Sequence, residues 1–136
     1  MNRQDFQNLA LIRLQEAEVL LQNGHYSGAY YLSGYVIECA LKACIAKYTR
    51  EFDFPDKQIA QASHTHDLTA LVRLARLELQ LQALRSDPDF EPKWSATKDW
   101  SEQSRYKIHT EQDAKGIYLA ITDPTHGVLQ WLQQHW

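Results

Sequence analysis

The sequence predicts an all-α protein: an up-down antiparallel bundle of four main helices plus a short helix, in one domain over residues 1–136. Two observations support this. The segment 29–43 is apolar on almost every side, and a helix that is apolar all round belongs inside a bundle. Apolar residues also recur every three or four positions in several stretches, which is the spacing of one helix face.

The first helix is expected over residues 4–23, where apolar side chains share one stripe. They are Phe6, Leu9, Ala10, Leu14, Ala17, Leu20 and Leu21. Asn23-Gly24 is typical of a helix end in the left-handed conformation. Arg13 lies within the stripe and has two interpretations: its stem packs while its head reaches solvent, or it pairs with Glu38. We favour the first.

The second helix is expected over residues 26–48. Small residues on one face, Ala29, Ser33 and Ala40, allow it to pack closely against the first helix. Residues 50–64 are predicted to be a loop because Pro55 interrupts them.

A third helix should begin after Asp67, a residue type that caps helices, with a stripe that continues to Leu79. Alternating leucines over 77–81 make a strand conceivable there, but the Leu, Gln and Ala content favours a helix. Residues 86–92, with two prolines, are predicted to be a loop, and residues 94–106 a short helix.

The final helix should start near Thr110, with acids in its first turn, and continue almost to residue 136. Its apolar register continues across Asp123-Pro124, which favours one kinked helix. The alternative is a new helix with Asp123 as its N-cap and Pro124 at its first position.

Charge and composition exclude several classes of protein. The net charge of -3 provides no strong basic field for nucleic acid, so any RNA contact would be local. No apolar run is long enough to span a bilayer, and the first residues do not resemble a signal peptide. Cys39 and Cys44 lie five positions apart in one helix and are poorly placed for a disulfide. We therefore expect a cytoplasmic protein with reduced cysteines.

A second stripe of the second helix combines aromatic and charged residues. Tyr31, Tyr35, Glu38 and Lys42 follow one another at steps of four, three and four. They either line a cleft and contact a nucleotide, with tyrosine stacking on a base, or form a structural network. In the network, Glu38 pairs with Lys42 or Arg13, and the tyrosines make a helix–helix or subunit contact. We favour the network.

Three motifs give the chain a resemblance to a known family. The stretch from Ala29 to Ala43, preceded by Gly24-His25-Tyr26, resembles the second helix of HEPN (higher eukaryotes and prokaryotes nucleotide-binding) domains. His66-Asp67-Leu68 at a helix start and Arg105-Tyr106 before the final helix are similar to that family as well. The resemblance covers nearly the whole chain. It implies a helical bundle that usually dimerises, often encoded beside a minimal nucleotidyltransferase as toxin and antitoxin.

Many members of that family are metal-independent ribonucleases, and their signature is an arginine followed by a histidine. Here three residues separate Arg105 from His109, one fewer than the family's shortest spacing, and Tyr106 stands where asparagine is common. In the ribonuclease interpretation His109 is the general acid or base and Arg105 stabilises the phosphorane. On a helix this spacing would place both on one face, but Thr110 as a cap would leave His109 outside it.

The resemblance implies a nucleotide- or RNA-associated module that acts with a nucleotidyltransferase partner, with Tyr106 beside the cleft residues. Two alternatives stay open: an active ribonuclease toxin that uses Arg105 and His109, or a non-catalytic interaction protein. No metal or cofactor is expected, because His64-x-His66 alone offers too few ligands. The tryptophans have two interpretations, RNA stacking or packing, and we favour packing. They are Trp94, Trp100, Trp131 and Trp136.

Overall fold

The computed structural model describes the backbone of residues 1–51 and 57–136, and all regular secondary structure in those residues is helical. The elements are α1 (Arg3–Gln22), α2 (Tyr26–Glu51), α3 (Lys57–Ala62), α4 (Leu68–Leu74), α5 (Glu78–Leu84), α6 (Glu91–Lys98), the 3₁₀ helix η1 (Glu102–Tyr106), α7 (Glu111–Thr122) and α8 (Val128–Gln133). The all-α prediction is confirmed.

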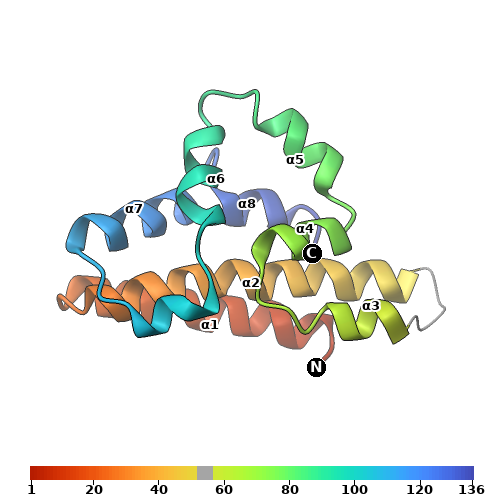
Figure 1. Cartoon of the computed structure of the whole chain (residues 1–136), viewed down its shortest axis with the longest axis horizontal. Helices are drawn as coiled ribbons and strands as arrows, with labels where there is room; N and C mark the ends of the chain where they lie inside the picture. Colours follow the sequence, from red (N-terminus) through yellow and green to blue (C-terminus); the bar gives the residue numbers. More distant parts are fainter. Residues whose placement is uncertain (52–56) are drawn as a thin grey trace.

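Helices α1 and α2 form a long antiparallel pair along the base of the molecule (Figure 1). Gly24 turns the chain between them at a φ of 79°, which glycine adopts without strain. Ala10, Ala17 and Ala29 are completely buried, and a Cβ added at Gly28 would lie 3.1 Å from the side chain of Leu20. The small residues for which close packing was predicted, Ala29, Ser33 and Ala40, are all completely buried.

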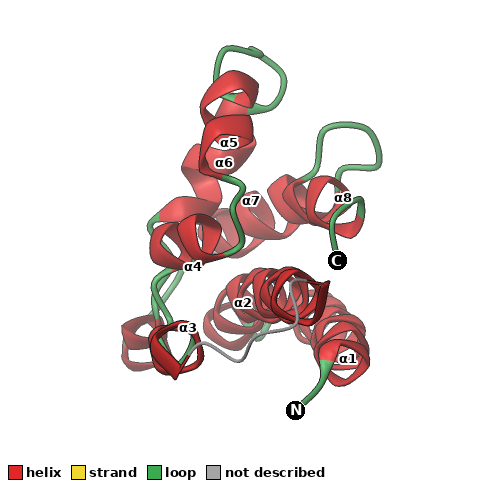
Figure 2. Ribbon diagram, turned by 90° about the vertical axis from the view of Figure 1, so that its right-hand side faces the viewer, coloured by secondary structure: helices red, strands yellow, loops and turns green. Residues whose placement is uncertain are grey.

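Helix α2 is the centre of the fold (Figure 2). It packs against α1 on one side and against α4, α7, α8 and η1 on the others. Its residues Val36, Ile37 and Leu41 are fully buried, together with Ile121 of α7 and Leu132 of α8. The prediction of a buried, apolar second helix is confirmed. The elements α1, α4, α7, α8 and η1 pack against it.

Three predictions for the middle of the chain are wrong. The predicted loop 50–64 contains α3, and α2 extends to residue 51; Pro55 itself lies outside the described residues. The predicted third helix is two helices, because Arg76 adopts a φ of 61° and breaks it between α4 and α5. Leu79, placed in its buried stripe, is therefore 81% exposed. Asp67 is the N-cap of α4, as predicted.

The C-terminal part is also more divided than the sequence suggested. The predicted helix 94–106 is α6 followed by η1, and α6 already begins within the predicted loop 86–92. The kinked final helix is wrong as well: α7 ends at residue 122, and α8 begins at residue 128 with Gly127 as its N-cap. The oxygen of Asp123 accepts the N–H groups of Thr125 and His126, so Asp123 closes a turn rather than starting a helix.

The described tryptophan side chains mostly serve packing. Trp94, Trp100 and Trp131 are buried, and the rings of Phe90 and Trp94 meet Trp131 edge-on. They hold α6 against α8. Among the described helices, no segment has both the length and the apolarity that a bilayer span requires.

Candidate functional site

A chain of charged side chains runs from the interior of α2 to the surface at η1. Glu38 is 2% exposed, and its carboxylate accepts a hydrogen bond from Lys42 Nζ at 3.3 Å. Its other oxygen lies 2.8 Å from Nδ1 of His66. Nε2 of His66 lies 3.0 Å from Glu102, and Glu102 lies 3.0 Å from Nη2 of Arg105. Five residues from α2, the start of α4 and η1 are thus connected.

His66 occupies the middle of this chain, and both of its ring nitrogens face carboxylate oxygens. An ionised carboxylate only accepts hydrogen bonds, whereas a neutral imidazole has one donor and one acceptor. Both contacts are favourable only when both nitrogens donate. His66 is therefore placed to bridge the buried carboxylate of Glu38 and the surface carboxylate of Glu102.

At the surface end, Arg105 lies over the ring of Tyr106, 4.8 Å from its centroid. The side chain of Arg105 is 43% exposed, and Tyr106 as a whole is 71% exposed. Hydrogen bonding with Tyr106 raises the pKa of Arg105 above its usual value, and the charge of Glu102 adds to this. A permanent cation and an accessible aromatic face are thus presented together, beside exposed Lys107.

Helix η1 is held in place by the tryptophan that precedes it. The Trp100 indole lies so close to Gly34 of α2 that a Cβ there would be 2.1 Å from its Cδ1. Its Nε1 donates to the carbonyl of Tyr31 at 3.1 Å, and its ring contacts the Tyr31 ring, with a centroid distance of 5.7 Å. Tyr31 in turn stacks on Tyr35. Burial raises the pKa of Tyr35, and the charge of Glu38 contributes further.

His109 lies in a different environment from Arg105. Its ring stacks on Tyr30 at 3.8 Å, its backbone N–H donates to Ser27, and its side chain is 13% exposed. Nδ1 is 3.9 Å from Asp113, and Nε2 is buried without a hydrogen-bond partner among the described residues. The two residues do not share a helix, because η1 ends at residue 106 and Thr110 caps α7.

The chain matches the model of one protein family. The model of the HEPN domain aligns with residues 4–134. The chain belongs to the HEPN family. Searches of curated proteins and of solved structures gave no significant match. At family level, this makes the chain a nucleotide- or RNA-associated module.

Sequence reasoning found part of this HEPN site. The predicted pair of Glu38 with Lys42 is confirmed, and Arg13 pairs with Glu16 at the surface, in agreement with the interpretation we favoured. It missed His66 and Glu102. The signal for His66 was present, because a buried glutamate needs more than one partner and the motif at residues 66–68 was one of the three family resemblances.

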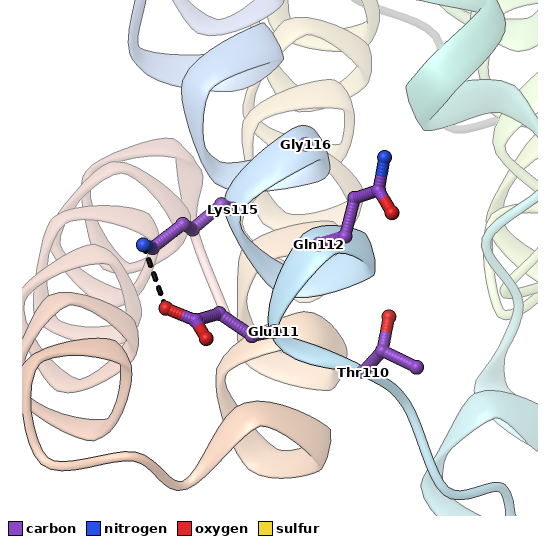
Figure 3. A pocket seen from close by; sticks show the side chains of 5 residues that line it. All are labelled: Thr110, Glu111, Gln112, Lys115 and Gly116. Carbon is purple, nitrogen blue, oxygen red and sulfur yellow. Dashed lines mark ion pairs between the residues drawn. The ribbon is translucent and has the colours of Figure 1, made fainter.

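A second surface of this HEPN domain, at the start of α7, has a different arrangement. A shallow depression at the first turns of α7 is lined by Thr110, Glu111, Gln112, Lys115 and Gly116 (Figure 3). Its charged side chains neutralise each other in a pair of 2.7 Å between Lys115 and Glu111. In the described part of the chain, no three His, Cys, Asp or Glu side chains are grouped to hold a metal ion.

Proposed function

We propose that this HEPN domain binds a phosphate-bearing ligand, a nucleotide or single-stranded RNA, at Arg105 and Tyr106. The observation that carries the proposal is the half-exposed Arg105 guanidinium over the Tyr106 ring, at the end of a chain of ion pairs from the core. Arginine binds phosphate through several parallel donors. An exposed tyrosine offers a surface on which a base stacks.

The charges of the site support an anionic ligand despite the net charge of -3. Lys42 and Arg105 balance the two carboxylates of Glu38 and Glu102, and His66 lies between those carboxylates. Exposed Lys107 adds an unbalanced positive charge beside Arg105. Tyr31, whose ring contacts Trp100, and Tyr35, on which Tyr31 stacks, complete the proposed site.

The alternative is a ribonuclease in which Arg105 and His109 cleave RNA. A general acid or base must lie within hydrogen-bond reach of the 2′-hydroxyl. In this structure His109 stacks on Tyr30, and its Nε2 has no access to solvent. Cleavage would require that ring to leave its place, so the geometry favours binding over catalysis.

The partners that we propose are a second copy of the chain and a minimal nucleotidyltransferase, in a toxin–antitoxin pair. Exposed apolar residues on the outer face of α1, Ile12 and Val19, and Leu119 of α7 support a subunit contact. Light scattering should report a dimer that Val19→Glu converts to a monomer. A monomeric wild type would contradict the proposed dimer. Co-expression with a nucleotidyltransferase encoded next to this chain should give a complex or a modified chain, and finding neither would contradict that partner.

The binding proposal is tested by fluorescence anisotropy with a labelled single-stranded RNA of about ten nucleotides at low salt. Arg105→Ala should weaken binding about tenfold or more, since it removes charge-assisted hydrogen bonds to phosphate. The matched control is Arg85→Ala, because Arg85 has the same 43% exposure and also pairs with a glutamate that is 30% exposed. Equal affinities for both variants and the wild type would contradict the proposal.

A further inference from the structure

We propose that His66 is a positioning residue, which fixes Arg105 for phosphate binding by joining surface Glu102 to buried Glu38. This inference rests on the proposed function. His66 does not reach the ligand itself. It acts through the carboxylate that pairs with Arg105.

The need for such a residue follows from the exposure of the groups at the surface. Arg105 and Glu102 are 43% and 30% exposed and belong to a 3₁₀ helix of five residues. Arg105 contacts Glu102 and the exposed ring of Tyr106, and surface contacts of this kind are weak and leave much rotamer freedom. An arginine side chain that is mobile before binding loses conformational entropy when the ligand orders it, and this weakens binding.

The contacts of His66 provide the missing anchor. Glu38 is 2% exposed on the central helix α2, and it is fixed by Lys42 as well as by His66. One ring nitrogen of His66 contacts this buried carboxylate and the other contacts Glu102, so His66 holds Glu102 in place relative to α2. Arg105 is therefore oriented before the ligand arrives.

The first test needs no ligand: the ¹⁵N NMR order of the Arg105 Nε–H group. We expect an ordered Nε–H in the wild type and a mobile one in His66→Gln. Both N–H donors of glutamine lie on one nitrogen, whereas the two carboxylates face two separate ring nitrogens of His66. His66→Arg, which can donate to both, should restore the order. The Nε–H of Arg85 serves as the internal control and should stay unchanged in all variants.

Unchanged order of Arg105 in His66→Gln would overturn the inference. If His66→Gln does not fold, Glu102→Ala takes its place, since it cuts the same chain at its exposed end. An Arg105 that remains ordered in Glu102→Ala would overturn the inference equally.

The second test is a double-mutant cycle of affinity for the short single-stranded RNA. His66→Gln should weaken binding about three- to tenfold in the wild type and have no further effect in Arg105→Ala, because coupled residues are not additive. An equal loss in both backgrounds would overturn the positioning role. If Arg105→Ala itself binds like the wild type, the proposed function fails instead, so the two failures are distinguishable.

Discussion

The two ends of the segment 105–109 are attached to α2 in different ways. Arg105 is connected to Glu38 through Glu102 and His66, and its guanidinium stays accessible. His109 is attached by stacking on Tyr30 and by its backbone bond to Ser27, and its ring is largely buried. Arg105 and His109 are four positions apart in sequence and resemble one catalytic motif. In the structure, however, the first is accessible to a ligand and the second is packed against α2.

The largest expected effect concerns the buried anchor of the Arg105 end. Glu38→Ala leaves Lys42, whose side chain is 14% exposed, and His66, whose side chain is 41% exposed, without their shared carboxylate. Because solvent reaches His66, the free energy of unfolding should fall by about 3 kcal/mol, the lower end of the range for a fully buried pair. Chemical denaturation measures it. A loss as small as that of an ordinary surface substitution would show that Glu38 anchors nothing.

The next effect concerns the contact that places η1. In Gly34→Ala the new Cβ would lie 2.1 Å from Trp100, so the indole or α2 must shift. We expect a loss of about 1–3 kcal/mol in the free energy of unfolding. The control is Gly116→Ala on α7, where a Cβ meets nothing within 4 Å, and the gain of about 0.5–1 kcal/mol expected for glycine-to-alanine in a helix should appear. Equal effects at both glycines would contradict the proposed placement of Trp100.

A smaller effect is expected at the His109 end. His109→Ala removes the stacking on Tyr30 and should cost about 1 kcal/mol of stability, with RNA affinity nearly unchanged. His109→Phe keeps the ring and should leave both quantities near the wild type. If instead purified protein cleaves RNA without metal and His109→Phe abolishes the cleavage, His109 is catalytic and does not serve only to pack against Tyr30.

The smallest expected effect is the slow labelling of the two native thiols of α2, Cys39 and Cys44, which needs no substitution. Burial raises the pKa of Cys39 and of Cys44 to about 12, so at pH 8 both remain protonated in the folded protein. The thiolate is the reactive form, and we expect thiol reagents to label them only when the chain unfolds. The labelling rate should rise with denaturant in parallel with unfolding. Fast labelling of the native protein would mean that α2 is not buried as described.

The sequence predicted what local patterns determine. The buried α2, the cap of α4 at Asp67 and the pair of Glu38 with Lys42 depend on spacing within one helix, and all three are confirmed. The break at Arg76 was not predicted, because the apolar register continues through it. At Asp123-Pro124 the continuing register favoured one kinked helix, and the separate helix that the structure has was only the alternative, with a start at Asp123 instead of Gly127.

The site itself was predicted only in part for the same reason. The contact between residues 38, 66 and 102 joins three segments that no periodicity relates. The close approach of Trp100 to Gly34 is a contact of the same kind, across 66 positions of the chain. Motif resemblance marked Arg105 and His66, but only the fold shows that a glutamate lies between them.

If Arg105 contacts a phosphate, the salt dependence of RNA affinity should report that contact. Each phosphate neutralised on a single strand contributes about 0.7 to the slope of the logarithm of affinity against the logarithm of salt concentration. Arg105→Ala should reduce that slope by about 0.7, whereas Arg85→Ala should leave it unchanged. An undiminished slope in Arg105→Ala, or no salt-dependent RNA binding by the wild type, would contradict a phosphate contact by Arg105.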